Sequence, residues 1–150
     1  MYTLVVIDLQ PGFIAGNKSR VRENALREIK RAVKDEADIV FLEFLGHGST
    51  HRHLMEVVQS YKRCQIKTKQ QDDGSSQVYE AVRDHGFMIG RFRVVGINTD
   101  FCVYSTVEGL RRRFPNSFIE VVSRACDSHN SHRKGLNKIR KLENIDIVPE

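Results

Sequence analysis

Short apolar runs alternate with segments of helical periodicity along the chain, and this alternation constrains the fold more than any other feature of the sequence. The run Thr3–Asp8, TLVVID, is rich in β-branched residues, as expected for a strand that is covered on both faces. From Lys18 to Lys34 the apolar residues recur at the spacing of a helix instead. An alternating order of strands and helices predicts a parallel sheet with helices on both faces.

The same patterns can be followed to the end of the chain. They predict strands at Thr3–Asp8, Asp38–Phe44, Cys64–Lys69, Arg91–Ile97, Ser117–Ser123 and Ile145–Val148. They predict helices at Lys18–Lys34, from Thr50 to about Tyr61, from Ser75 or Ser76 to Gly86, from Thr99 or Asp100 to about Phe114, and at Ser131–Glu143. We therefore expect a single domain over residues 1–150, an α/β fold of three α/β/α layers. Its six-stranded sheet should be mainly parallel, with the Rossmann-like strand order 3-2-1-4-5-6.

The totals fit an ordinary globular protein in a reducing compartment. A chain of 150 residues can bury about two-thirds of its unfolded surface. No apolar run approaches the roughly 20 residues that span a bilayer, and the start MYTLVVIDLQ has no basic region typical of a signal peptide. The three cysteines are odd in number and widely spaced, which argues against a disulfide framework. We expect a cytoplasmic protein without a membrane partner.

The net charge of +5 does not by itself indicate a nucleic-acid partner. Basic residues are spread along the chain and mixed with acidic ones. The local run Arg111–Arg113 precedes a predicted helix end, where cations complement the helix dipole. Because the chain has no recognisable nucleic-acid motif, we expect no nucleic-acid partner.

Three reactive side chains stand at the carboxyl ends of predicted strands. Asp8 closes the first strand, Lys69 closes the third, and Cys102 follows the fourth in the first turn of a helix. Taken singly, they are explained as a turn aspartate, a surface lysine and a packed cysteine. The carboxyl ends of parallel strands, however, form the edge at which such sheets bind ligands. Their joint placement therefore favours a chemical site.

The three residue types together suit attack on a carbonyl carbon. A free cysteine has a pKa of about 8.5, and a helix N-terminus or a nearby ammonium favours its thiolate. A neighbouring carboxylate can take the thiol proton and later return it to a leaving group. Backbone N–H groups of the turn INTDFC can face a developing oxyanion.

Four stretches of the chain resemble one family, the isochorismatase-like cysteine hydrolases, which include nicotinamidases and N-carbamoyl amide hydrolases. The stretches are VVIDLQPGF, KQQDDGS, GINTDFCVYST and IEVVSRACDS. The resemblance implies a hydrolase that cleaves a C–N bond of a small amide or carbamoyl compound through a thioester. It places the catalytic triad on Asp8, Lys69 and Cys102 and a backbone oxyanion hole on Asn98 and Cys102. It also implies a cis peptide bond between Ile97 and Asn98.

The sequence departs from this family in several places and leaves one assignment open. Lys67 competes with Lys69, because alternate residues of a strand share a face; the spacing to DDGS favours Lys69. The aromatic residue that usually follows the lysine segment is replaced by GSSQV, and Arg124 stands where many members have aspartate. The chain is short between the second strand and Lys69, so we expect a homo-oligomer whose neighbouring subunit supplies missing walls.

Histidines gather after the second predicted strand, at His47, His51 and His53. Two of them could bind zinc with Glu43, but their spacing matches no standard zinc signature and the metal motif of nicotinamidases is absent. We therefore expect no metal and no cofactor. Instead, Glu43, His47 and Thr50 are predicted to line the substrate pocket, with Phe13 as an apolar wall.

Two other functions are compatible with parts of the sequence. A non-catalytic protein of the same fold could bind a small molecule or a protein, and reactivity distinguishes it: an activated Cys102 should react with iodoacetamide near pH 6, before Cys64 and Cys126. A dinucleotide-dependent oxidoreductase is disfavoured, because QPGFIAG after the first strand lacks the Gly-x-Gly-x-x-Gly pattern. True isochorismatases, which cleave a vinyl ether, typically lack the cysteine that stands here at 102.

Overall fold

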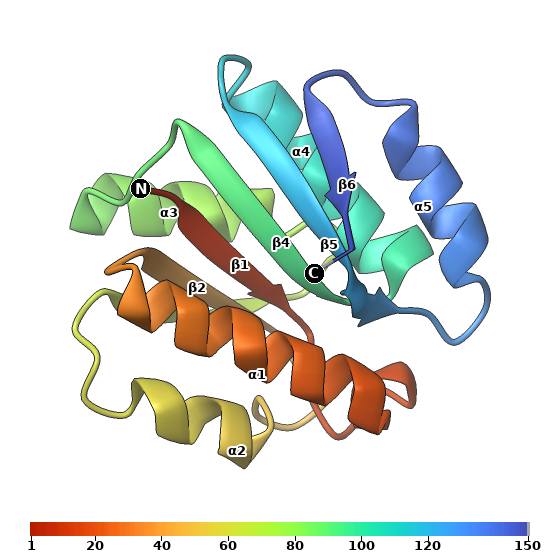
Figure 1. Cartoon of the computed structure of the whole chain (residues 1–150), viewed down its shortest axis with the longest axis horizontal. Coiled ribbons are helices and arrows are strands. Elements are labelled where there is room, and N and C mark those ends of the chain that lie inside the picture. Colours follow the sequence, from red (N-terminus) through yellow and green to blue (C-terminus); the bar gives the residue numbers. More distant parts are fainter. Residues whose placement is uncertain (150) are drawn as a thin grey trace.

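The computed structural model describes residues 1–149 and shows a six-stranded parallel sheet with helices on both faces (Figure 1). Its strands are β1 (Thr3–Ile7), β2 (Asp38–Phe44), β3 (Cys64–Lys69), β4 (Arg91–Ile97), β5 (Phe118–Asp127) and β6 (Ile145–Val148). Their order is β3-β2-β1-β4-β5-β6, and every neighbouring pair is parallel. The predicted fold class and strand order are confirmed.

The helices form the two outer layers. They are α1 (Ser19–Lys34), α2 (Arg52–Met55), α3 (Ser75–His85), α4 (Tyr104–Arg113) and α5 (His132–Arg140). In Figure 1, α1 and α2 cover one face of the sheet, while α3, α4 and α5 cover the other. No helix within residues 1–149 has the length and apolar character needed to cross a membrane.

Alternate residues of the central strands divide the core into two clusters. In β1, Leu4 and Val6 pack against α1, whereas Val5 and Ile7 pack against the helices of the opposite face. All four side chains are buried. A strand that is covered on both faces needs apolar residues at successive positions, which is why β1 appears as an uninterrupted apolar run.

The second helix is shorter than the sequence predicts, and a different residue begins it. The N-cap of α2 is His51, and after α2 the chain continues as a 3₁₀ turn over Glu56–Val58. Thr50 does not cap this helix, because its backbone N–H and its hydroxyl both donate to the carboxylate of Glu43. A competing side-chain partner has therefore shifted the helix start.

The fifth strand is longer than predicted, because its pairing with β4 changes register. Val94 pairs with Val121, whereas Gly96 pairs with Cys126, so the irregularity lets β5 continue to Asp127. Gly96 has a φ of 132°, and a Cβ atom there would overlap the carbonyl oxygen of Ile7. Only glycine fits this contact between β4 and β1 without strain.

The turn after β4 also differs from the prediction. Residues Thr99–Val103 form a π-helical turn, the N-cap is Asn98, and α4 begins only at Tyr104. Neither Thr99 nor Asp100 caps the helix: Thr99 bonds His132 Nδ1 and Asp100 accepts from Ser128. Short π-helical segments occur frequently at functional sites.

Candidate active site

Asp8 directly follows β1, and its carboxylate is completely buried. Its backbone takes the left-handed conformation, with φ 53°, and its N–H donates to the carbonyl of Leu42 on the neighbouring strand. The carboxylate Oδ2 lies 3.0 Å from Nζ of Lys69. Burial raises the pKa of Asp8, while the charge of Lys69 opposes that rise.

Lys69 ends β3, and its ammonium connects the other two predicted triad residues. Besides Asp8, Nζ reaches Sγ of Cys102 at 3.4 Å and donates to the carbonyl of Gln71 at 3.0 Å. Only 1% of the residue surface is exposed. The rival Lys67 lies 4.0 Å from Glu80 of α3 instead. Lys69 is therefore the lysine that the fold brings to Asp8 and Cys102.

Cys102 lies within the π-helical turn, with 4% of its surface exposed. Burial raises the pKa of its thiol, the charge of Asp8 raises it further, and Lys69 opposes both effects. This direction is opposite to the lowered pKa that the sequence analysis expected, and the labelling of Cys102 near pH 6 stays a prediction. That expectation considered the helix N-terminus and the lysine but neglected burial beside a carboxylate.

The predicted oxyanion hole falls at the start of the same turn. The peptide bond between Ile97 and Asn98 is cis, as the family resemblance implied. The carbonyl of Asn98 accepts from the N–H groups of Phe101 and Val103, and its side-chain Oδ1 accepts from the N–H of His129. These bonds fix the segment that carries the N–H groups of Asn98 and Cys102, whose role as an oxyanion hole stays a prediction.

An aromatic group lies beside the lysine and includes two of the predicted pocket residues. The rings of Phe13 and His47 stack with centroids 4.1 Å apart. The ring of Phe44 meets both edge-on, and Lys69 Nζ lies 4.3 Å from its centroid. The sequence analysis did not predict Phe44, although as the last residue of a strand next to Asp8 it stands at the same edge of the sheet.

Glu43 is not brought to this group. Its Oε2 accepts the N–H of Thr50 at 2.5 Å and the hydroxyl of Thr50 at 2.8 Å, which anchors the loop after β2. Neighbouring residues of a strand point to opposite faces, so Glu43 points away from the face on which Phe44 meets Lys69. Glu43 and Thr50 therefore hold the loop that bears His47, and neither lies at the triad.

The residues after β2 do not form a metal site in this structure. Within residues 1–149 no group of three or more histidine, cysteine, aspartate or glutamate side chains is placed to hold a metal ion. The carboxylate of Glu43 is occupied by Thr50, and the ring of His47 is stacked on Phe13. These residues therefore do not fit a zinc site.

A second carboxylate lies near the sulfur and was missed by the sequence analysis. Oδ1 of Asp72 is 3.7 Å from Sγ of Cys102. The carbonyl of Asp72 accepts from Nζ of Lys69 and from the hydroxyl of Thr106, both at 3.4 Å. In the sequence Asp72 appears only as part of a polar turn, and no periodic signal would have identified it.

Comparisons with known proteins agree with the observed fold. The model of the isochorismatase domain family matches residues 2–145. No curated protein sequence gives a significant match. Among solved structures, nicotinamidase SaPncA of Staphylococcus aureus has a TM-score of 0.82 at 18% identity, with 97% of each chain covered.

Two further solved structures share the fold but differ in named activity. N-carbamoylsarcosine amidase of Thermoplasma acidophilum has a TM-score of 0.76 at 16% identity, covering 98% of this chain and 95% of that one. The MAR1 ribonuclease of Caenorhabditis elegans has a TM-score of 0.82 at 21% identity, covering 98% of this chain and 76% of that one. At such identities the likeness establishes the fold alone.

Proposed function

Since the chain belongs to the isochorismatase family, we propose that it is a cysteine hydrolase that cleaves a C–N bond of a small amide or carbamoyl compound. One observation supports this proposal most: the ammonium of Lys69 lies 3.0 Å from the carboxylate of Asp8 and 3.4 Å from the sulfur of Cys102. A base, a cation and a nucleophile thus meet at the edge where parallel sheets bind ligands.

In the first half of the proposed reaction, Asp8 takes the proton of the Cys102 thiol and the sulfur attacks the substrate carbonyl. Negative charge develops on the carbonyl oxygen, and the N–H groups of Asn98 and Cys102 donate hydrogen bonds to it. When the tetrahedral intermediate collapses, the C–N bond breaks and Asp8 returns the proton to the leaving nitrogen. The acyl group stays on Cys102 as a thioester.

In the second half, water replaces the leaving amine. Asp8, again a carboxylate, takes a proton from the water while the oxygen attacks the thioester carbonyl. The intermediate expels the sulfur, and the proton returns to Cys102. Lys69 holds Asp8 in place, because both side chains are buried and the ammonium is the counter-charge of the Asp8 carboxylate.

The proposed substrate is small, and we propose that a second copy of the chain completes its site. The loops that follow the strands present exposed apolar side chains at Ile14, Leu45 and Phe101. All three follow the carboxyl ends of central strands, after β1, β2 and β4 respectively. A neighbouring subunit packed there would supply the missing wall of the substrate pocket. We further propose a cytoplasmic protein, since its cysteines are unpaired.

Replacing the nucleophile tests the proposal. Cys102→Ala should reduce turnover of responsive amides, ureas or carbamoyl compounds by about a thousandfold or more, because the thioester cannot form. Ammonia or amine release is the measurement, and Cys64→Ala is the matched control with unchanged turnover. Circular dichroism should show that both variants fold.

Two outcomes would contradict the proposal. Full turnover by Cys102→Ala would exclude the sulfur as nucleophile. Failure of the wild-type protein to hydrolyse any of these compounds, while it binds one of them or cleaves an RNA oligonucleotide included in the panel, would favour the non-catalytic alternative or another reaction.

A further inference from the structure

The carboxylate of Asp72 stands at the exposed side of the candidate active site. Asp72 is exposed, whereas Asp8 and Lys69 are completely buried and Cys102 nearly so. Its Oδ1 is nevertheless only 3.7 Å from Sγ of Cys102. A substrate that comes from solvent to the sulfur therefore passes within a few ångströms of this carboxylate.

The position of Asp72 is fixed by its backbone. Its carbonyl accepts from Lys69 Nζ and from the hydroxyl of Thr106 on α4, and the same hydroxyl accepts from the N–H of Gly74 at 3.0 Å. A Cβ atom at Gly74 would overlap the side chain of Leu42, so glycine is required for this close approach. The loop 70–74 is thereby held against β2, β3 and α4.

The charge of Asp72 is uncompensated. Asp8 and Lys69 cancel each other, and the neighbouring Asp73 has its own partners, Arg112 and the N–H of Ser75. Across residues 1–149, no lysine, arginine or histidine forms an ion pair with Asp72. With the sulfur as a neutral thiol, the site therefore has one net negative charge at its open side.

We propose that Asp72 is a specificity-determining residue that selects substrates with a positively charged group close to the scissile carbonyl and repels anionic ones. Ammonium and guanidinium groups fit this description, since a carboxylate binds them by charge-assisted hydrogen bonds. The proposal rests on the proposed function, because it assumes that the site binds a substrate. The charge selection itself can be measured at Cys102 without turnover.

A pair of thiol reagents of opposite charge provides the test. Trimethylammonioethyl and sulfonatoethyl methanethiosulfonate are of similar size, and both react by the same step. The Cys102 sulfur attacks the sulfenyl sulfur, a mixed disulfide forms, methanesulfinate leaves with the bonding electron pair, and the thiol proton passes to solvent. Peptide mass mapping gives the rate at Cys102 apart from Cys64 and Cys126, and both rates are normalised to those of a free thiol.

Wild-type protein should favour the cationic reagent, and Asp72→Asn should reduce the ratio of cationic to anionic rate constants about tenfold. That factor is the effect of one removed charge on reagents of charge +1 and −1 at roughly 6 Å in a water-like dielectric. Asp73→Asn removes the same charge one residue away, keeps an oxygen for the N–H of Ser75, and should change the ratio by less than about twofold.

An unchanged ratio in Asp72→Asn would overturn the proposal. Should that variant fail to fold, Asp72→Ser and the salt dependence of the wild-type ratio replace it: the ratio must fall toward that of a free thiol at 1 M salt, where the Debye length is about 3 Å. A ratio insensitive to salt would count equally against Asp72.

Paired amides that differ only in an ammonium or a carboxylate group extend the test to turnover. The wild-type enzyme should prefer the cationic amide, and Asp72→Asn should lose that preference. If the reagents show charge selection but no amide is hydrolysed, the proposed function fails while the role of Asp72 survives. If amides are hydrolysed without charge preference, the role of Asp72 fails alone.

Discussion

Cys102 is poised as a thiol rather than as a preformed thiolate, and this state follows from its neighbours. Burial disfavours the charged sulfur, and the nearby carboxylate of Asp8 disfavours it further, whereas only Lys69 favours it. The Cys102–Asp8 pair therefore holds its proton on sulfur until a substrate can accept the developing charge. In such a site the thiol alone reacts slowly, and the neighbouring base, Asp8, activates it when a substrate is bound.

This balance predicts that removal of the carboxylate activates the thiol toward a simple alkylating agent. In Asp8→Asn, the charge of Lys69 acts on the sulfur unopposed, so the pKa of Cys102 should fall by about one to three units. Labelling by iodoacetamide should then begin at lower pH than in the wild-type protein. Turnover should nevertheless be lost, because the base is gone.

Mass spectrometry of the Cys102 peptide across pH 6 to 11 measures this shift, and Cys64 serves as an internal control. Burial raises the pKa of Cys64 to about 12, without a contribution from Asp8. Its labelling should be the same in both proteins. A Cys102 profile that stays in place or moves to higher pH in Asp8→Asn would mean that Asp8 does not control the thiol.

At the scale of elements, α5 supports the turn that carries the nucleophile. Gly135 of α5 faces this turn, where an added Cβ atom would lie 2.6 Å from the N of Asp100 and 2.6 Å from the C of Thr99. The contact is between backbones, so neither element can yield by a change of rotamer. Glycine is unfavourable inside a helix, and its presence at position 135 is explained by the close packing of α5 against this turn.

Gly135→Ala should therefore displace the turn rather than merely improve the helix. We expect it to lower the free energy of unfolding by about 1–3 kcal/mol, the usual effect of overpacking, although alanine is the better helix former. Urea unfolding measures this loss, and turnover should fall as the turn shifts. Lys134→Ala, at the neighbouring exposed position, is the control; if Gly135→Ala proves as stable and active as Lys134→Ala, the packing argument is wrong.

The elements also show what could be predicted from the sequence and what could not. The bounds of β2, β3, β4 and β6 match the prediction. β2 and β4 are apolar runs buried between the helical layers, whereas β3 and β6 are partly exposed edge strands whose ends are marked by turn residues. The helix starts after β2 and β4 were wrong, because Thr50 and Thr99 bond distant side chains instead of capping. A cap that competes with a tertiary partner cannot be recognised from local sequence.

The same distinction applies to the candidate site. Asp8, Lys69 and Cys102 could be placed together from the sequence. The carboxyl ends of parallel strands lie at the same edge of the sheet, and this does not depend on the conformation of the loops. Asp72 could not, because its position depends on bonds from Lys69 and from Thr106, which lies 34 residues further along the chain. Sequence patterns thus locate the residues on strand ends and miss those on loops held by other elements.

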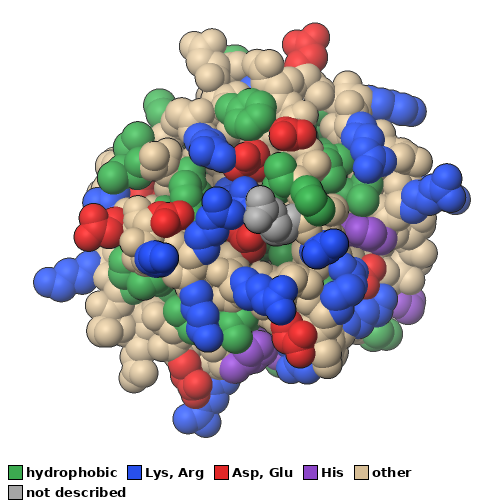
Figure 2. All heavy atoms as spheres, in the orientation of Figure 1, with side chains coloured by type: hydrophobic (Ala, Val, Ile, Leu, Met, Phe, Trp, Pro, Cys, Tyr) green, Lys and Arg blue, Asp and Glu red, His purple; other side chains and the backbone are tan. Residues whose placement is uncertain are grey.

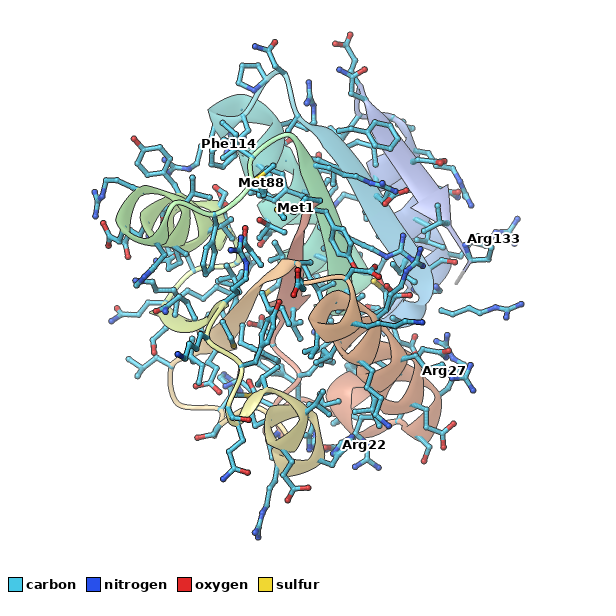
Figure 3. All side chains as sticks on the ribbon, turned by 60° about the vertical axis from the view of Figure 1, so that its left-hand side comes forward. Met1, Arg22, Arg27, Met88, Phe114 and Arg133 are labelled. Carbon is cyan, nitrogen blue, oxygen red and sulfur yellow. The ribbon has the colours of Figure 1, made fainter. Side chains whose placement is uncertain are left out.

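At the scale of the whole molecule, basic residues gather over α1, on the face shown in Figure 2. A hollow of about 300 Å³ on this face is lined by Asn24, Arg27, Glu28, Arg31 and Arg124. Arg22 and Arg27 point outward from α1 in Figure 3, where Met1, Met88 and Phe114 mark the opposite, amino-terminal end of the strands. The basic surface lies over α1, the helix that covers the face of the sheet opposite α3 and α4.

Beneath the basic surface, a buried ionic network joins α1 to the sheet. Arg93 of β4 bonds both carboxylate oxygens of Glu28 on α1 and also reaches Glu120 of β5 at 3.2 Å. Arg91 forms a further pair with Glu120. Burial alone would raise the pKa of Glu120, but the bonds and charges of Arg91 and Arg93 lower it below its ordinary value.

A lowered pKa in the folded protein gives a defined pH dependence of stability. Above the ordinary glutamate pKa of about 4.3, Glu120 is charged in both states and contributes its full stabilisation; as pH falls through the lowered pKa of the folded state, that contribution is lost. Glu120→Gln should therefore cost about 1–3 kcal/mol at pH 7, because Arg93 and Arg91 lose a buried partner. The deficit should shrink below about pH 4, where the wild-type carboxylate becomes protonated as well.

Urea unfolding at pH 7, 5, 4 and 3 measures this convergence, and Glu143→Gln provides a control. Glu143 is exposed, so its replacement should leave the free energy of unfolding unchanged at every pH. A deficit in Glu120→Gln that is as large at pH 3 as at pH 7 would assign the loss to altered packing. Convergence of the two curves would instead show that charge, placed between α1, β4 and β5, holds the helical layer beneath the basic surface to the sheet.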